Sequence, residues 1–263
     1  MRARADGPFV GCPSIADPVW RVAHRLPGAL KERLEAIADE YTESVLLGTG
    51  QFCTNPGIVI VQVTRTSLQP PMPPRLTPRT FSAIRSIPSV SLTIFDSGGQ
   101  AGDDAEKLVA GVKARMKAAP VGTMLGPSAA DSFGEGLELL IKAGAEVVTG
   151  GKRGGGKGYC FQNTLLRTSG KDFIADPEGM QTEIFGNGGL FVVCDSSDEI
   201  AEVCRQFEGN LTGCIYSDTQ GSDDALYWEI APELRSHVGR LLNDKMPTGV
   251  SSTRAYFDQA EPW

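Results

Sequence analysis

Histidine and cysteine, the residues behind many catalytic and metal sites, are scarce in this sequence of 263 residues. Only two histidines are present, His24 and His237, which leaves little material for a Ser-His-Asp triad or a histidine-rich metal site. The six cysteines form no Cys-x-x-Cys pair and are too few for a disulfide scaffold, as is typical of a reducing compartment. We therefore expect no metal site, and most of the thiols should be small core residues.

Clustered positive charge and long apolar runs are also missing. The formal net charge is −7, whereas nucleic acids and anionic membranes attract clustered Lys and Arg. No stretch of about 18 apolar residues is present to span a bilayer, and the first residues lack the apolar core of a secretory signal. We expect a cytoplasmic protein that acts on a small molecule, with neither nucleic acid nor membrane as its partner.

Helical and strand patterns alternate along most of the chain. Apolar residues recur every three or four positions in five segments, and short apolar or β-branched runs lie between them. The helices are expected at about 27–47, from 103, around 133–141, after Ser196 and at 223–234, and the strands at 57–63, 145–151, 190–195, 211–217 and 237–242. Ser196 with Glu199 three residues on forms a capping box. This order predicts an α/β fold with an open, mostly parallel sheet and flanking helices.

A segment of different composition interrupts this alternation at about 64–98. Between residues 64 and 95 there are six prolines and four arginines but no Asp, Glu or Lys. Proline removes backbone donors and breaks both helices and central strands. We expect an extended, largely disordered insertion there.

One cysteine, Cys53, stands in a setting that packing alone does not require. It lies in the stretch GTGQFCTNPG, between the first predicted helix and an apolar strand. A catalytic thiol needs access, ionisation and nearby hydrogen-bond donors, and a loop with small neighbours offers all three. Gly48 and Gly50 allow close approach of a ligand, and Pro56-Gly57 turns the chain back into the sheet. Cys53 is therefore the candidate nucleophile, and a buried loop cysteine is the alternative.

The residues around Cys53 also carry a resemblance. The stretch LPGALKERLEAIADEYTESVLLGTGQFCTNPGIVIV is similar to the catalytic-cysteine region of the aldehyde dehydrogenase superfamily, in particular the branch that oxidises α-ketoglutaric semialdehyde (2,5-dioxovalerate). The resemblance implies that Cys53 attacks an aldehyde to form a thiohemiacetal. Hydride then passes to NAD or NADP, and water releases the acid from the thioester.

A second stretch, MQTEIFGNGGLFVV, resembles the E-x-F-G-P motif of the same family. The resemblance implies that Glu183 binds the nicotinamide ribose hydroxyls and that Phe185 packs beside the ring. A carboxylate suits a ribose because it accepts from two adjacent hydroxyls. Asn187 replaces the usual proline, which is expected to alter the turn, and an exposed loop acid is the alternative reading of Glu183.

The glycine-rich stretch GGKRGGGKG, residues 150–158, invites comparison with a phosphate-binding loop. It lacks the G-x-x-x-x-G-K-[ST] order and does not open onto a helix. The similar family has a glycine-rich turn between strands at this place. We therefore expect a structural turn.

The likeness runs from about Gly7 to Val250 and covers roughly the catalytic half of the family's chain. Residues 1–263 are thus expected to form one aldehyde dehydrogenase-like catalytic domain, without the dinucleotide-binding domain. Gly11 or Cys12 stands where the family's general-base Glu belongs.

Three accounts fit these departures. The chain is a fragment or misread product of an aldehyde dehydrogenase gene, one half of a split enzyme with a complementary dinucleotide-binding chain, or a non-catalytic regulatory or interaction module. We favour the first account and expect little turnover from the chain alone. A homo-oligomer is compatible with each account, and the sequence does not distinguish NAD from NADP.

Overall fold

The computed structural model describes residues 20–25, 27–63 and 104–248, with side chains from residue 28 onward. These residues form a seven-stranded sheet in the order β3-β4-β5-β2-β1-β6-β7. The strands are β1 (Trp20–Arg25), β2 (Ile58–Gln62), β3 (Glu146–Thr149), β4 (Thr164–Ser169), β5 (Gly188–Cys194), β6 (Asn210–Tyr216) and β7 (Val238–Asn243). All neighbouring strands run parallel except β3 and β4, which confirms the predicted mostly parallel sheet.

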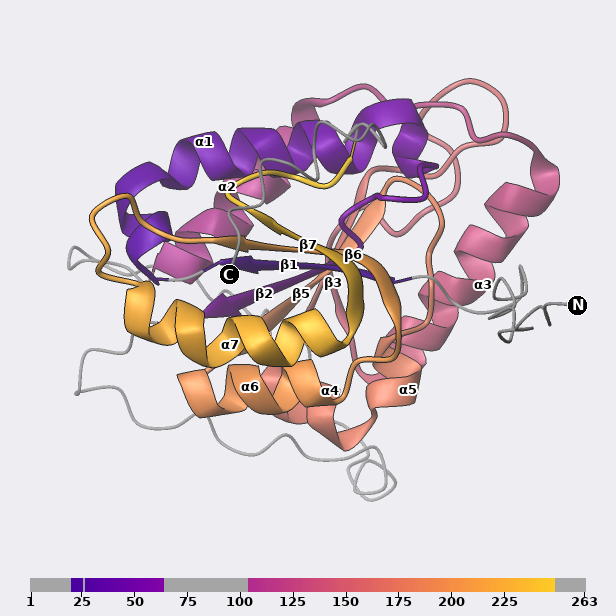
Figure 1. Cartoon of the computed structure of the whole chain (residues 1–263). Coiled ribbons are helices and arrows are strands. Elements are labelled where there is room, and N and C mark those ends of the chain that lie inside the picture. The colour runs from indigo at the N-terminus through magenta and orange to yellow at the C-terminus, as the bar shows by residue number, and fades with distance from the viewer. Residues whose placement is uncertain (1–19, 26, 64–103, 249–263) are drawn as a thin grey trace, which may run out of the picture.

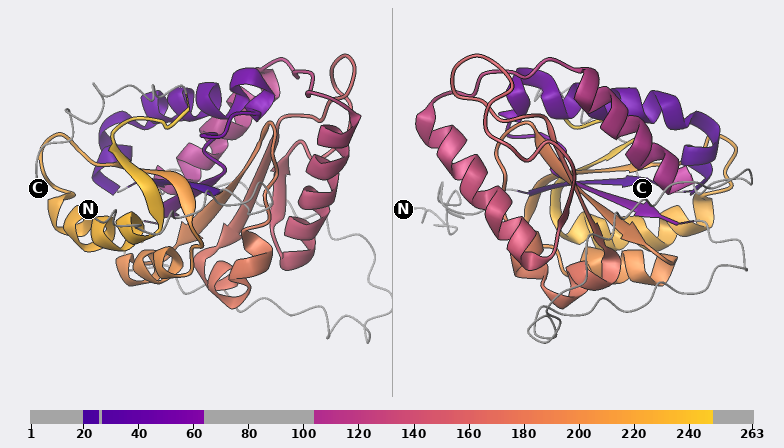
Figure 2. Two further views of the ribbon diagram at one scale, coloured as in Figure 1. Left: turned by 45° about the vertical axis from the view of Figure 1, so that its right-hand side comes forward. Right: turned by 180° about the vertical axis from the view of Figure 1, so that it is seen from behind.

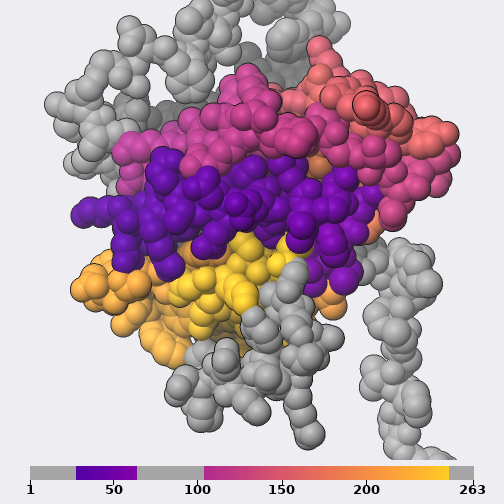
Figure 3. Space-filling view, turned by 90° about the horizontal axis from the view of Figure 1, so that it is seen from above, coloured from indigo at the N-terminus to yellow at the C-terminus, as the bar shows by residue number. Residues whose placement is uncertain are grey.

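Helices cover both faces of the sheet (Figure 1). The helices are α1 (Pro27–Leu46), the 3₁₀ turn η1 (Leu47–Gly50), α2 (Asp104–Ala118), α3 (Pro127–Ala143), α4 (Gly170–Ala175), α5 (Pro177–Met180), α6 (Ser197–Arg205) and α7 (Asp224–Ser236). Helices α1 and α2 lie on one face, whereas α4, α6 and α7 lie on the other, and Figure 2 shows the same layers from two more sides. Figure 3 looks onto the first face, where the indigo α1 crosses the molecule beside the magenta α2.

Each face of the sheet has its own apolar core. In β2, Ile58 and Ile60 join the cluster under α3 to α7, and Val59 and Val61 join the cluster under α1 and α2. All four side chains are fully buried. Successive residues of a strand point to opposite faces, so a continuous apolar run fits a strand that is covered on both sides. The predicted buried strand at 57–63 is confirmed.

The fold differs from the sequence-based expectation at several elements. Strands β1 and β4 were not predicted, because WRVAHR and TLLRTS mix charged or hydroxyl residues with few apolar ones. They lie inside the sheet because they pair with strands that are distant in sequence, and the local pattern of apolar residues does not predict such pairing. The apolar spacing of Ile200, Val203 and Phe207 predicts a helix that reaches Phe207, but α6 ends at Arg205.

The predicted capping box at α6 forms with one changed partner. The Ser196 hydroxyl accepts from Glu199 N at 3.2 Å, as predicted, but Glu199 Oε2 accepts from Asp195 N at 2.5 Å rather than from Ser196. The glycine-rich residues 150–158 lie in the connection between the antiparallel strands β3 and β4, as expected for a structural turn. The proline-rich segment at 64–98 lies outside the described residues.

Candidate functional site

Two loops of the sequence-based prediction enter adjacent strands of the sheet. The loop with Cys53 leads into β2, and the loop with Glu183 and Phe185 leads into β5. The two strands are parallel neighbours, with Ile58 opposite Leu190. Parallel strands have their amino ends at the same edge, so the two loops meet there. This is the edge opposite to the carboxyl ends at which open α/β sheets usually bind ligands.

Cys53 lies at an exposed position in a tight turn. Its turn is closed by a hydrogen bond from Asn55 N to Phe52 O at 3.1 Å. Gly48, Thr49 and Gly50 precede it with φ values of 56°, 61° and 70°, so the chain passes through a left-handed bend. A β-branched residue rarely adopts this conformation, and Thr49 does so within four residues of the thiol. The thiol is accessible, as nucleophilic attack requires.

The two loops are in direct contact. Asn55 Nδ2 donates a hydrogen bond to Gly186 O at 3.1 Å, within the buried interior. At Gly50 the backbones approach so closely that an added Cβ would lie 2.0 Å from Gly186 O. Only glycine fits this crossing, because it has no Cβ and accepts a positive φ.

A third segment, residues 119–126, joins the first two. Leu125 N donates to Gln51 Oε1 at 2.8 Å, and the Thr49 hydroxyl donates to Thr123 O at 3.2 Å. A cleft of about 440 Å³ opens beside this junction, at the start of α3. It is lined by Leu125, Gly126, Ser128, Ala129, Ser132 and Phe185.

Phe185 lines this cleft, and Glu183 lies two residues before it on the same loop. Phe185 is 36% exposed and forms one wall of the cleft. Glu183 is half-buried, and its carbonyl lies against Gly136 of α3, where an added Cβ would be only 2.8 Å away. A carboxylate for hydroxyl groups and an aromatic face beside an open cleft are chemically suited to the ribose and ring.

Asn187, which stands where the resembling motif has proline, anchors the loop from inside. It is 1% exposed, and its Nδ2 donates to Phe161 O at 2.9 Å and to Asn163 Oδ1 at 2.8 Å. Asn163 in turn donates to Met116 O at the end of α2, at 3.0 Å. Proline could make none of these side-chain contacts, so a buried amide network supports the turn here.

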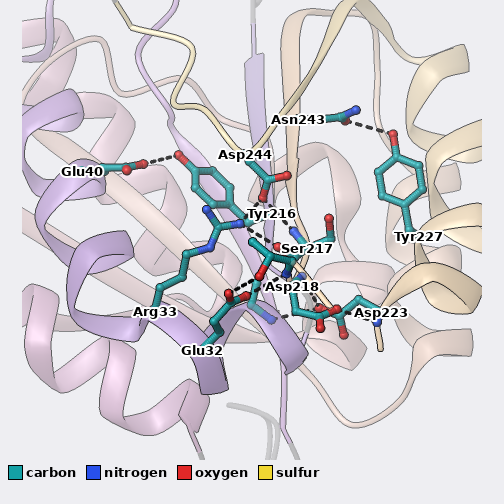
Figure 4. Close-up of polar contacts among 12 residues, drawn as sticks. Glu32, Arg33, Glu40, Tyr216, Ser217, Asp218, Asp223, Tyr227, Asn243 and Asp244 are labelled. Carbon is teal, nitrogen blue, oxygen red and sulfur yellow. Dashed lines mark hydrogen bonds and ion pairs between the residues drawn. The ribbon is translucent and has the colours of Figure 1, made fainter. Parts of the chain in front are cut away.

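At the carboxyl ends of β6 and β7, side chains of the protein contact one another and the start of α1 (Figure 4). Here α1 begins after β1, and residues 217–223 follow β6. The Asp223 carboxylate accepts hydrogen bonds from Gly28 N and Ala29 N, both at 2.9 Å. An amino terminus of a helix attracts anions, and in this fold a buried carboxylate already occupies that place.

Further polar contacts close the same edge. Arg33 leaves the helical conformation within α1 and donates to Ser217 O at 2.6 Å and to the Asp244 carboxylate. The Tyr216 hydroxyl donates to Glu40 Oε2 at 2.6 Å. Hydrogen bonds from the hydroxyl and the amide of Thr219 lower the pKa of Glu32. These contacts therefore hold α1 against the ends of β6 and β7.

The other described cysteines are unlike Cys53. Cys160, Cys194, Cys204 and Cys214 are buried. Burial raises the pKa of Cys194 and Cys204 well above the ordinary thiol value, with a smaller contribution from the charge of Glu199 to Cys194. Both burial and the raised pKa therefore protect Cys194 and Cys204 from reaction, and burial alone limits access to Cys160 and Cys214.

The described residues contain neither a candidate metal site nor a candidate membrane-spanning helix. Among them, no group of three or more His, Cys, Asp or Glu side chains could hold a metal ion. No helix in the same part of the chain has the length and apolar character to cross a membrane.

Comparison with known proteins identifies the family. A model described as "Aldehyde dehydrogenase family" matches residues 100–231, half of the chain. The chain belongs to the aldehyde dehydrogenase family. The matched segment runs from the residues before α2 into α7 and includes the loop of Glu183 and Phe185, whereas Cys53 precedes it.

Aldehyde dehydrogenases are also found among individual relatives. The "Alpha-ketoglutaric semialdehyde dehydrogenase 2" of Azospirillum brasilense is 29% identical over 232 residues, covering 85% of this chain and 35% of that protein. The mitochondrial succinate-semialdehyde dehydrogenase of Mus musculus is 29% identical over 113 residues, covering 43% of this chain and 20% of that protein. The chain thus spans about a third of the length of the first relative.

Solved aldehyde dehydrogenase structures share the fold. Aldehyde dehydrogenase 21 from Physcomitrella patens, in complex with the reaction product succinate, matches with a TM-score of 0.57 and 14% identity over 89% of this chain and 39% of that one. A 1-pyrroline-5-carboxylate dehydrogenase from Thermus with bound NAD matches with a TM-score of 0.58 and 18% identity, over 88% of this chain and 36% of that one.

The structure brings all three predicted site residues of this aldehyde dehydrogenase chain onto neighbouring loops. Cys53 lies on one loop, and Glu183 with Phe185 lies on the loop packed against it. The sequence did not reveal the connecting residues Gln51 and Asn55. Gln51 contacts Leu125, 74 residues later, and Asn55 contacts Gly186, 131 residues later. Polar residues beside glycine and proline are typical of solvated turns, and no local signal marks such distant contacts.

Proposed function

We propose that this chain carries the nucleophile of an NAD(P)-dependent aldehyde dehydrogenase that oxidises an aldehyde to a carboxylic acid. One observation supports this most strongly: the exposed Cys53 loop and the Glu183–Phe185 loop are packed on each other at one edge of the sheet. A nucleophile and groups suited to a nicotinamide riboside are thus held on one rigid scaffold. Such an arrangement favours reaction between the aldehyde attached to Cys53 and a cofactor beside Glu183 and Phe185.

In the proposed reaction Cys53 adds to the aldehyde carbon. A carbon–sulfur bond forms, and the carbonyl electron pair moves to oxygen, which becomes the oxyanion of a thiohemiacetal. Glu183 would accept from the ribose hydroxyls of the cofactor and Phe185 would pack against its nicotinamide ring, so that both would orient it. NAD or NADP, when bound, would accept the hydride that leaves the thiohemiacetal carbon, and the oxyanion pair re-forms the carbonyl of a thioester on Cys53. Water then breaks the thioester carbon–sulfur bond, which releases the acid and restores the thiol.

We propose a semialdehyde as the substrate class. The relatives from Azospirillum brasilense and Mus musculus are named as semialdehyde dehydrogenases, which supports this choice. We also propose that the chain contributes a single catalytic domain, with an insertion at 64–98 between β2 and α2. The free thiols are typical of a reducing compartment and favour the cytoplasm.

The test compares reaction at Cys53 with and without substrate. The full chain is labelled with limiting iodoacetamide, with succinic or α-ketoglutaric semialdehyde present or absent, and peptides are mapped. We expect Cys53 to be labelled before Cys160, Cys194, Cys204 and Cys214, and to be protected by the semialdehydes but not by succinate or α-ketoglutarate.

Cofactor reduction is followed in parallel by absorbance with NAD or NADP, and Cys53→Ala is the control. Because little turnover is expected from the chain alone, slow reduction that is abolished by Cys53→Ala supports the dehydrogenase, and rapid Cys53-dependent reduction would overturn the expectation that the chain is incomplete. Two results together would refute the assignment of the nucleophile and favour a non-catalytic module. They are Cys53 labelling that the semialdehydes do not change, and a rate of cofactor reduction that is the same in Cys53→Ala. Size-exclusion chromatography of the same sample shows whether the chain forms a homo-oligomer.

A further inference from the structure

Asn55 contributes to both loops of the candidate site. Its backbone N–H closes the turn that carries Cys53, by donating to Phe52 O at 3.1 Å. Its side chain, which is 3% exposed, donates from Nδ2 to Gly186 O at 3.1 Å. Cys53 is two residues before Asn55, and Phe185 is one residue before Gly186. The nucleophile and the aromatic wall of the cleft are therefore connected through one side chain.

The backbone around this contact has little freedom to move. Pro56 follows Asn55 and restricts its φ and ψ to extended values. On the other side, Gly186 O also accepts from Gly188 N at 2.8 Å, so its direction is set within its own loop. A small shift of Asn55 is therefore transmitted to Gly186 rather than absorbed.

The same contact is more important for geometry than for folding. If the Asn55 amide is removed, Gly186 O retains its bond from Gly188 N and is not left without a donor. The two strands behind the loops, β2 and β5, stay paired through five residue pairs. By contrast, a misplacement of about 1 Å between reacting groups costs about a hundredfold in rate.

We propose that Asn55 is a positioning residue that fixes Cys53 relative to the loop of Glu183 and Phe185. This inference rests on the proposed function, because it assigns the bound cofactor to that second loop. It predicts that a cofactor bound at the Glu183–Phe185 loop changes the reactivity of Cys53, and that this effect depends on Asn55.

The experiment compares Asn55→Ala with Asn210→Ala in the full chain. Asn210 is a matched control, since it is also buried and donates one bond to a backbone carbonyl, Glu208 O at 2.7 Å, but it lies at the start of β6. Hydrogen exchange followed by mass spectrometry is measured in peptides covering 47–57 and 182–188. We expect faster exchange in both peptides for Asn55→Ala and unchanged exchange there for Asn210→Ala.

The second readout is the rate of Cys53 labelling by iodoacetamide with and without NAD or NADP. In the unaltered chain and in Asn210→Ala we expect the cofactor to slow labelling by about fivefold or more, the lower end of usual coupling between two sites. In Asn55→Ala the cofactor effect should fall below about twofold, which is less than such coupling provides. A merely structural role would change stability without changing this ratio.

Several outcomes overturn the proposal. Unchanged exchange at 182–188 in a folded Asn55→Ala chain, or an unchanged cofactor effect on Cys53, excludes the link. If Asn55→Ala does not fold, Asn55→Ser is used, whose shorter hydroxyl also loses the contact, and failure of both to fold assigns Asn55 to the fold itself. If the cofactor has no effect on the unaltered chain, the cofactor site of the proposed function fails, while the exchange data still decide whether Asn55 connects the loops.

Discussion

Asp223 caps helix α1 at Gly28, a residue 195 positions earlier in the chain. Both carboxylate oxygens are used, one for Gly28 N and the other for Ala29 N and, at 3.1 Å, for Asp218 N. An added Cβ at Gly28 would lie 2.6 Å from the carboxylate, so the helix begins directly against the loop that follows β6. The cap therefore connects the first helix to the last third of the chain.

Replacing this carboxylate should destabilise the protein. We expect Asp223→Ala to lower the free energy of unfolding by about 1–2 kcal/mol, as loss of a helix cap does, because Gly28 N and Ala29 N lose their acceptor. Urea unfolding followed by circular dichroism measures the change. Asp224→Ala is the matched control, since Asp224 is exposed and adjacent, and an equal loss in both variants would refute the special role of Asp223.

The crossing of the two site loops should not tolerate a side chain at Gly50. We expect Gly50→Ala to lose about 1–2 kcal/mol from its left-handed backbone alone, with a further cost because its Cβ overlaps Gly186 O. Cys53 labelling should also change, since the loops must separate. Gly209→Ala, at a position with no neighbouring atom within 4 Å, should be nearly neutral. A neutral Gly50→Ala variant would contradict the observed crossing.

The amide network around Asn187 should contribute measurably to stability. Asn187→Ala removes the donor to Phe161 O and leaves Asn163 Oδ1 without that bond in a buried place. A buried polar group that loses its partner costs about 1–3 kcal/mol, so we expect the free energy of unfolding, measured by urea titration, to fall by that amount. Asn187→Asp, which offers an acceptor in place of the donor, should be at least as damaging. A fully stable Asn187→Asp chain would show that the amide donor is unnecessary.

Stability should also fall at alkaline pH because of two buried thiols. The pKa values of Cys194 and Cys204 are raised in the folded chain, so the unfolded chain loses these protons first. Above the ordinary thiol pKa of about 8.5, each thiol should lower the free energy of unfolding by up to about 1.4 kcal/mol per pH unit. Below that pH the two thiols contribute no slope.

Unfolding by urea at pH 8 and pH 10 tests this dependence, with the double variant Cys194→Ala/Cys204→Ala as the comparison. The double variant is expected to be less stable at both values, but its loss between them should be smaller. An equal loss in both chains would assign the alkaline sensitivity to other groups, such as Tyr227, whose pKa is also raised by burial.

Local pattern was sufficient for elements that are uniformly apolar or amphipathic. The run IVIV of β2 and the helical spacing of Leu108, Val112 and Met116 in α2 each predicted the element that the structure contains. Strand β4 was missed because Thr164, Arg167 and Ser169 weaken its apolar signal, while its burial depends on β5 beside it.

The site could be predicted only in part, because it also depends on contacts between residues that are distant in sequence. The Gly and Pro residues around Cys53 predicted an exposed loop, and the cysteine is exposed. Its role as nucleophile stays a prediction, as do the roles of Glu183 and Phe185. Asn55 and Asn187 act through contacts with residues that are distant in sequence. From sequence alone, an amide side chain in a turn is expected to face solvent, because its partners are not known.

The central position of β1 has a consequence for folding. Residues 21–25 pair with 212–216 of β6 as well as with β2, so the middle of the sheet joins segments separated by about 190 residues of chain. Loop-closure entropy must be overcome before such distant pairs form, and the chain is made from its amino terminus at about 5–20 residues per second. The amino-terminal strand therefore waits on the order of ten seconds or more for its second neighbour. During that interval the edge of β1 that pairs with β6 in the folded chain lacks this neighbour, and such an edge can pair with another chain.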